Sequence, residues 1–130
     1  MKMREIIFKA KRIDTEEWIE GIYLPKTQEI VIAESNSIYQ YYKVDPRTVC
    51  QYTGMKDKDG NKIWENDILK CYKYAYGRQR TSYEIVKYVN GAYKTDSINN
   101  LSFCSSIQFV LVVGNIFEST ENMIGGCTHE

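Results

Sequence analysis

Turn-forming residues divide this chain into short segments in which apolar and polar side chains alternate. The clearest turn is Asn90-Gly91, which stands between strand-like segments at residues 83–89 and 92–94. An Asn-Gly pair supplies the two residues of positive φ that a two-residue β-hairpin turn requires. No amphipathic segment is long enough for a helix of more than about two turns. The sequence therefore predicts a mainly β fold.

Further segments have the alternation or the continuous apolar run that is typical of strands. They are residues 4–11, 17–24, 28–34, 38–44, 68–76 and 107–113. Residues 77–82 are polar and are expected to form a loop. Asp45 and Pro46 predict a single helical turn, because proline is favoured at the first helical position and aspartate as its cap. A second capped helical turn is expected at residues 119–124.

Aromatic side chains support the same fold class. The 130 residues include 11 Tyr, 4 Phe and 2 Trp but only 2 Pro, and tyrosine favours half-buried pleated surfaces. We expect large apolar side chains from the second half of the chain to form the core. These are Trp64, Ile68, Phe109, Leu111 and Val113.

The sequence predicts a protein that is made and kept in the cytosol, without a membrane segment. The apolar run Ile6-Ile7-Phe8 is too short for a signal peptide, and no window approaches the roughly 20 apolar residues that span a bilayer. The cysteines are widely spaced, with no CxxC pair, and the only histidine is His129. They are Cys50, Cys71, Cys104 and Cys127. We therefore expect free thiols in a reducing compartment rather than a zinc site.

The acidic residues at 57–61 raise the alternatives of a calcium loop and a tight turn. An EF-hand loop that begins at Asp57 needs Gly at its sixth position and Glu at its twelfth, where this chain has Lys62 and Ile68. Aspartate side chains accept hydrogen bonds from nearby backbone N–H groups, and Gly60 can take a positive φ. The stretch is thus predicted to be a turn.

Glu65-Asn66-Asp67 has two interpretations as well. The two carboxylates are spaced like a general acid and base, but such a pair needs a shared pocket and further polar partners. The favoured interpretation is a bend in which Asn66 has a left-handed conformation between two strands.

An enzyme is the least favoured function class. The chain has neither a GxxxxGK loop nor a GxGxxG motif, and its one histidine is almost terminal. Asn115, a polar residue in an apolar run, is interpreted as a hydrogen-bonded core amide rather than a catalytic group. We expect no catalytic residue, no metal and no cofactor.

Several motifs resemble those of the YopX family, small proteins encoded by bacteriophages and prophages. The motifs are residues 4–10, residues 44–54 (VDPRTVCQYTG), Asp57, Asp59-Gly60, Ile63, residues 65–69 and residues 113–118. The family commonly has Gly where this chain has Asn66, and often Pro where it has Ser119-Thr120-Glu121.

The resemblance implies a phage origin and an SH3-like β-barrel at residues 49–118. It also implies a small N-terminal β-rich (α+β) part at residues 1–48, before a short helical turn and tail at 119–130. It implies no activity and offers no catalytic residues, because the family is known by sequence and fold.

The most suggestive functional stretch is residues 70–88, where basic and aromatic residues are interleaved. The candidate binding residues are Lys70, Tyr72, Lys73, Tyr74, Tyr76, Arg78, Arg80 and Lys87. Basic side chains neutralise phosphates and aromatic rings stack on bases, so single-stranded nucleic acid is a candidate ligand. Alternatively, the alternating tyrosines belong to the core.

Two observations favour a protein partner or self-association over nucleic acid. The formal net charge is zero, from 17 basic and 17 acidic residues, whereas nucleic-acid-binding proteins usually carry a basic excess. Small β proteins also bind peptides through aromatic-lined surfaces, and their exposed edge strands can pair with each other. We expect a non-catalytic protein-binding or self-associating module.

Overall fold

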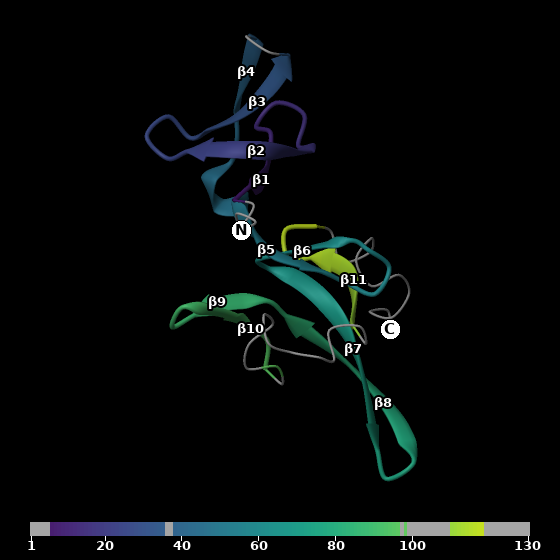
Figure 1. The fold of residues 1–130 in the computed structure, drawn as a ribbon. Helices are drawn as coiled ribbons and strands as arrows, with labels where there is room; N and C mark the ends of the chain where they lie inside the picture. The colour runs from purple at the N-terminus through teal and green to yellow at the C-terminus, as the bar shows by residue number, and fades with distance from the viewer. Residues whose placement is uncertain (1–5, 36–37, 97, 99–109, 119–130) are drawn as a thin grey trace, which may run out of the picture. The chain divides into compact units, whose positions relative to one another are not determined.

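The computed structural model describes residues 6–35, 38–96, 98 and 110–118 of the chain (Figure 1). Apart from one short 3₁₀ turn, the described elements are β-strands, which confirms the mainly β prediction. The chain divides into two units, Met1–Tyr52 and Thr53–Glu130. The helical turn expected at 119–124, as well as Phe109, Cys104 and Cys127, lie outside the described residues.

The first unit is an antiparallel sheet with the strand order β4-β3-β2-β1. Its strands are β1 (Phe8–Lys11), β2 (Trp18–Leu24), β3 (Glu29–Ser35) and β4 (Ile38–Lys43). The first residues of β5 (Cys50–Lys56) pair with β1. These strands confirm those expected in this part of the sequence.

The expected helical turn is η1 (Pro46–Thr48), which lies between β4 and β5. Its cap is Asp45, whose carboxylate accepts a hydrogen bond from the backbone N–H of Arg47 at 3.0 Å. The Arg47 guanidinium and this backbone bond hold the pKa of Asp45 below its usual value.

The first unit has a core of its own, because alternate side chains of each strand point to the same face. Ala10, Ile30 and Val44 are fully buried in this core. A Cβ atom at Gly21 would lie 2.3 Å from the carbonyl oxygen of Val31, so only glycine fits between these strands.

The second unit contains the remaining strands in short sheets. They are β6 (Lys62–Trp64), β7 (Asp67–Ala75), β8 (Arg78–Ile85), β9 (Lys87–Val89), β10 (Ala92–Lys94) and β11 (Val110–Asn115). β5 continues into this unit and neighbours β6, β7 lies between β11 and β8, and β9 pairs with β10. Within the described residues these strands do not form a closed barrel.

The second unit also has its own core. It consists of Ile63, Leu69, Cys71, Val86, Tyr93 and Val110. Trp64 and Ile68 are buried as predicted. Cys71 in this core and Cys50 in the first unit have free thiols, and both are buried.

The prediction that Leu111 and Val113 are buried was wrong, since both are half-buried. Leu111 lies opposite Lys70 on the face of β7 that points away from the core, whereas Val112 packs against the core. The register of β11 then shifts between Val112 and Gly114, so the alternation does not continue through Val113.

Two turns have the backbone conformations that the sequence predicts. Asn90 and Gly91 have φ values of 51° and 86° and join β9 to β10 in a hairpin. Asn66 has a φ of 71° and forms the bend before β7.

The prediction of a loop at residues 77–82 was wrong. β8 begins at Arg78 and pairs with β7 from Ala75 back to Ile68. Tyr76 and Gly77, with φ values of 53° and 74°, form the whole turn. The segment expected as one strand at 83–89 is divided between β8 and β9.

No helix in the described part of the chain is long and apolar enough to cross a membrane.

Candidate functional site

The acidic stretch at residues 57–61 is a hydrogen-bonded turn. The Oδ1 atom of Asp57 accepts hydrogen bonds from the backbone N–H groups of Asp59 and Asn61, each at 2.9 Å. Its Oδ2 atom accepts from the backbone N–H of Val112, also at 2.9 Å. The carboxylate therefore closes the turn and connects it to β11, which confirms the turn interpretation.

Asp67 is also a structural carboxylate. It is 1% exposed, and its Oδ2 atom accepts a hydrogen bond from the backbone N–H of Trp64 at 2.8 Å. The Nδ2 group of Asn115 donates to Asp67 Oδ1 at 2.9 Å, and Asn115 Oδ1 accepts from the backbone N–H of Phe117 at 3.1 Å. Asn115 is therefore a hydrogen-bonded core amide, as predicted.

Within the described ranges, no group of three or more His, Cys, Asp or Glu side chains is placed to hold a metal ion.

Most of the candidate binding residues lie on the outer part of the β7–β8 hairpin. We call residues 72–83 the arm. Residues directly opposite each other in an antiparallel pair share a face, and neighbours along a strand point to opposite faces. The register therefore shows which candidate residues lie together.

The arm separates the candidate tyrosines from the candidate arginines. Tyr72 lies opposite Thr81 and Tyr74 opposite Gln79, on the same face as the Lys70–Tyr83 pair. We call Lys70, Tyr72, Tyr74 and Tyr83 the tyrosine face. Lys73 lies opposite Arg80, and Arg78 lies opposite Ala75, on the other side of the hairpin. We call Lys73, Arg78 and Arg80 the basic face.

The tyrosines of the arm are surface residues rather than core residues. Tyr74 is 71% exposed, Tyr83 is 44% exposed, and Tyr76 at the turn is fully exposed. Tyr72 is half-buried, and the ammonium groups of Lys58 and Lys70 lie 5.6 and 5.4 Å from its ring centroid. The core interpretation is thus wrong for Tyr74 and Tyr76.

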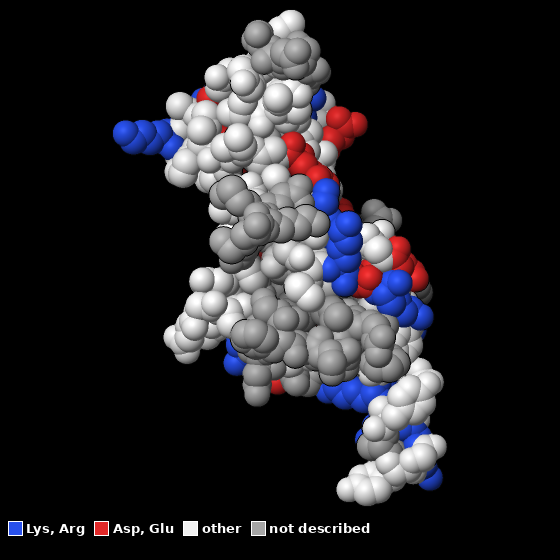
Figure 2. Space-filling view, in the orientation of Figure 1, with Lys and Arg blue, Asp and Glu red and all other residues white. Residues whose placement is uncertain are grey.

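The arm, together with Lys70 beside it, has a local excess of positive charge. Residues 70–83 contain Lys70, Lys73, Arg78 and Arg80 and no acidic residue. In Figure 2 the end of the arm lies at the lower right, where Lys and Arg atoms lie next to uncharged atoms.

A buried carboxylate balances part of this charge at the base of the hairpin. Glu84 is 7% exposed and accepts hydrogen bonds from the hydroxyls of Ser82 at 2.7 Å and Thr95 at 2.6 Å. The Lys73 ammonium lies 3.5 Å from the same carboxylate. Among the described residues, Arg78 and Arg80 have no such ion pair.

Lys87 is not part of either face of the arm. It begins β9 and donates a hydrogen bond from Nζ to the side-chain oxygen of Asn66 at 2.8 Å. The interaction holds Lys87 at the bend before β7.

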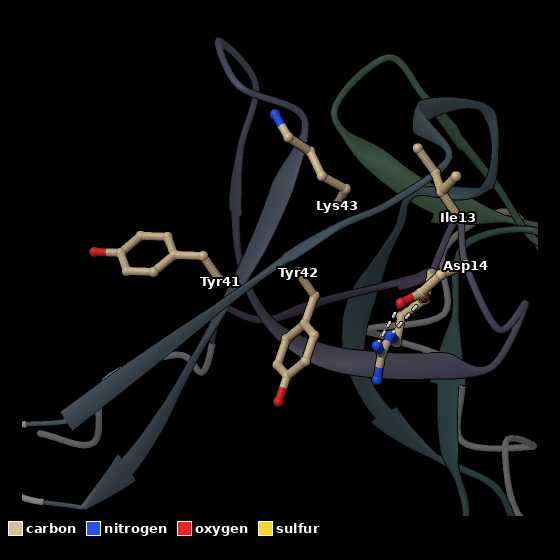
Figure 3. Close-up of a pocket in the computed structure, with 6 residues that line it drawn as sticks. Ile13, Asp14, Tyr41, Tyr42 and Lys43 are labelled. Carbon is tan, nitrogen blue, oxygen red and sulfur yellow. Dashed lines mark hydrogen bonds and ion pairs between the residues drawn. The ribbon is translucent and has the colours of Figure 1, made fainter.

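The first unit contains an open pocket that the sequence analysis did not predict. It has a volume of about 450 Å³ and is lined by Arg12, Ile13, Asp14, Tyr41, Tyr42 and Lys43 (Figure 3). The pairing of distant strands brings these residues together, so no local motif indicates the pocket.

Both cations that line this pocket have hydrogen-bond partners. The Arg12 guanidinium donates to both carboxylate oxygens of Asp14, at 3.0 and 2.7 Å, and its Cζ atom lies 4.6 Å from the centroid of the Tyr42 ring. The hydrogen bond with Arg12 lowers the pKa of Asp14. The pocket therefore offers a neutralised ion pair, an aromatic face and the Lys43 ammonium, which donates to the carbonyl of Thr27 at 3.0 Å.

Residues 4–123 match the protein family described as YopX protein. The chain belongs to the YopX family. A similar fold is present in the crystal structure of protein EF1440 from Enterococcus faecalis, with a TM-score of 0.54 and 23% sequence identity. The similarity covers 88% of this chain and 94% of the Enterococcus faecalis chain, and it shows the fold alone. A comparison with curated proteins found no match.

Proposed function

We propose that this YopX-family protein is a phage- or prophage-encoded accessory protein that binds another protein through the arm and catalyses no reaction. The observation that carries the proposal is the exposure of Tyr74, Tyr76 and Tyr83 on one hairpin. Tyrosine and arginine are the residue types that most often dominate the energy of a protein interface. The arm presents both types, Arg78 and Arg80 among them.

The separation of the two faces favours a protein partner over a single nucleic-acid strand. A strand that stacks its bases on Tyr74 needs cations for its phosphates nearby. The arginines of the arm point to the opposite side of the sheet, which leaves Lys70 and Lys58, both beside Tyr72, as the cations near the tyrosine face. A protein partner can enclose both sides of a hairpin, because its surface is not limited to one narrow strand.

Single-stranded nucleic acid is the second candidate, because residues 70–83 carry no acidic residue. Lys58 and Lys70 flank Tyr72 on the tyrosine face and would supply phosphate contacts there. This alternative requires binding that weakens steeply as the salt concentration rises.

The proposed site of action is the cytosol of the host cell. An SH3-like barrel at residues 49–118 remains part of the proposal, and it places the arm as a projection from the barrel. No catalytic role is assigned, because the buried carboxylates Asp57 and Asp67 accept hydrogen bonds from backbone and amide groups.

The test is affinity capture from host cells with the wild-type chain, the variant Tyr74→Ser/Tyr76→Ser and the control Tyr39→Ser/Tyr41→Ser. We expect the wild type and the control to capture the same protein, and the arm variant to lose it. The captured protein is then purified and titrated, with an expected loss of affinity of at least about tenfold in the arm variant.

Nuclease treatment and oligonucleotide titration separate the two candidates. Capture that survives nuclease supports the protein partner. Capture that nuclease abolishes, together with salt-dependent binding of single-stranded DNA that Lys70→Ser weakens, would replace it with the nucleic-acid function. Equal capture by the arm variant and the wild type would refute the arm as the binding surface.

A further inference from the structure

The outer edge of β4 offers backbone groups for pairing with another strand. β4 is the last strand of its sheet and pairs with β3 on one side only. The backbone N–H of Val44 donates to the carbonyl of Gln28 at 3.1 Å, toward the β3 side. The carbonyl of Lys43 accepts from the N–H of Ile13 at 3.1 Å, on the other side.

The two hydrogen bonds identify which residues of β4 point their backbone groups toward the open edge. Backbone N–H and C=O groups of successive residues point to opposite edges of a strand. Because the backbone groups of Lys43 point toward the open edge, those of Tyr41 and Tyr39 do so as well. Among the described residues, no strand pairs with β4 at Tyr39 and Tyr41.

Residues 38–42 of β4 lack the charged residues and prolines that usually prevent edge pairing, and the one charged residue of the strand, Lys43, lies at its end. Natural edge strands are protected by charged residues, proline or bulges. The register shift of this strand pair lies between Ala33 and Ser35 of β3. Residues 38–42 read IYQYY and contain no charge, no proline and no glycine. Such segments have a high tendency to form intermolecular sheets.

The side chains along this edge are also exposed. Ile38 and Tyr39 are each 55% exposed, Tyr41 is 57% exposed, and Ile22 on the same sheet is 61% exposed. The register places Tyr41 opposite Val31, which lies opposite Ile22, so these residues share one face. The edge and this apolar face are continuous.

We propose that a second copy of this chain pairs with β4 in antiparallel orientation, about a two-fold axis through Gln40. This register places Tyr39 of each copy opposite Tyr41 of the other. Both residues point their backbone groups outward, so each pair exchanges two hydrogen bonds. The tyrosine side chains then form two cross-strand aromatic pairs, which stabilise antiparallel sheets.

The hydrogen bond at Lys43 disfavours the register one residue further along β4. An axis through Tyr41 would place Tyr39 opposite Lys43, whose outward carbonyl already accepts a hydrogen bond from Ile13. The axis through Gln40 uses only the open part of the edge. It also brings no like charges together, because residues 38–42 are uncharged.

The pocket beside this edge extends the same interface. Figure 3 shows Tyr41 and Tyr42 pointing in different directions from β4, with Tyr42 toward the Arg12–Asp14 pair. In the proposed register, Ile38 of the second copy lies opposite Tyr42. An aliphatic side chain suits this position, because the Arg12 charge is already neutralised by Asp14.

A second copy fits the edge better than an unrelated peptide, because the segment Tyr39-Gln40-Tyr41 is symmetric about its centre. Two-fold interfaces bring the same patch of each subunit together and require this self-complementarity. The interface is small, so we expect a reversible dimer rather than a permanent one. The inference makes the self-association expected from the sequence specific, and it uses a surface distinct from the arm.

The first test is sedimentation of the full chain over a concentration series from about 1 µM to about 1 mM. We expect a monomer–dimer equilibrium that shifts toward monomer by at least about tenfold in Tyr39→Lys/Tyr41→Lys, because the paired lysines repel each other. The matched control is Tyr74→Lys/Tyr76→Lys, which makes the same change on the arm and should keep the dimer. Circular dichroism of each variant verifies that it is folded.

The second test examines the register by disulfide formation. Residues at the centre of a non-hydrogen-bonded antiparallel pair have Cα atoms about 4.5 Å apart, within the range of a disulfide. Gln40→Cys should therefore form a cross-linked dimer on mild oxidation, above the background of the wild-type chain. Thr27→Cys, an exposed position in the turn after β2, should not.

A chain that is monomeric at every concentration would overturn the proposal and leave the arm's partner binding untouched. A dimer that the arm control abolishes and the β4 variant keeps would place the interface on the arm instead. A dimer without the Gln40→Cys cross-link would refute the proposed register.

Discussion

Asp57 and Asp67 are buried carboxylates that connect segments far apart in the sequence. Asp57 accepts a hydrogen bond from the backbone of Val112, and Asp67 accepts one from the side chain of Asn115. Hydrogen bonds to an ionised acceptor are stronger than those between neutral groups. A substrate or ion at either carboxylate would have to displace these donors, which is why both residues act as structural groups.

Replacing Asp57 with alanine should destabilise the protein. The substitution leaves the backbone N–H groups of Asp59, Asn61 and Val112 without their acceptor at a largely buried position. Unsatisfied buried donors are costly, so we expect a loss in the free energy of unfolding on the order of 2–3 kcal/mol. Urea denaturation at pH 7 measures it. Asp59→Ala, at an exposed position, is the matched control and should cost less than about 0.5 kcal/mol.

The stabilisation by Asp57 should also depend on pH. Burial raises the pKa of Asp57, but hydrogen bonds from Val112, Asn61 and Asp59 outweigh it and lower the pKa below the usual value. A lowered folded-state pKa gives stabilisation that is present above about pH 4 and is lost as the pH falls through the folded-state value. The stability difference between wild type and Asp57→Ala should therefore narrow in acid. A difference that widens in acid would contradict the direction of this pKa shift.

Asn66 offers a test of backbone conformation. Its φ of 71° is strained for residues with a Cβ atom, and least so for asparagine. Asn66→Gly should change the free energy of unfolding by less than about 0.5 kcal/mol, whereas Asn66→Ala should cost about 1 kcal/mol. Thermal or urea unfolding measures both variants. Equal costs would assign the effect to the lost Lys87 hydrogen bond instead.

At the scale of elements, the sequence predicted turns and most strands because their signals are local. Asn90-Gly91 and Asn66 require positive φ, and Asp57 bonds to residues within its own turn. β2 and β3 are rich in β-branched and aromatic residues and are bounded by turn residues, so both could be predicted from the sequence.

The first part of β8, residues 78–82, was predicted as a loop for a physical reason. Its outer residues 78–81 are exposed on both faces, so they show no apolar alternation. Only the pairing with β7, a non-local interaction, makes them a strand. The candidate residues of the arm could be named from the sequence, but their division between two faces depends on the two-residue turn at Tyr76 and Gly77. The pocket at Arg12 and Tyr42 likewise depends on strand pairing.

The arm should contribute little to folding stability. Tyr74 and Tyr76 are exposed, whereas Leu69 at the base of the same strand is fully buried. Each serine substitution at Tyr74 or Tyr76 should change the free energy of unfolding by less than about 0.5 kcal/mol. Leu69→Ala should cost about 2–5 kcal/mol. If urea denaturation shows a large loss in the free energy of unfolding for the tyrosine variants, the arm packs against the rest of the protein and is not free to bind.

At the scale of the whole molecule, the chain has two separate hydrophobic cores. Ile30 is central to the first, with Ala10 and Val44, and Ile63 belongs to the second, with Leu69. Regions with separate cores can open independently, because loss of packing in one core does not directly remove contacts in the other. The two units are therefore candidates for separate cooperative folding units.

Two matched substitutions test this independence. Ile30 and Ile63 are both fully buried, so Ile30→Val and Ile63→Val remove the same methylene group from each core. Each should destabilise its own unit by about 0.5–1.5 kcal/mol. Hydrogen exchange under native conditions should then be roughly 2–10 times faster in β2 and β3 for Ile30→Val, and in β7 and β11 for Ile63→Val, since about 1.4 kcal/mol corresponds to tenfold. Equal acceleration of all four strands by either variant would show that the protein opens as one cooperative unit.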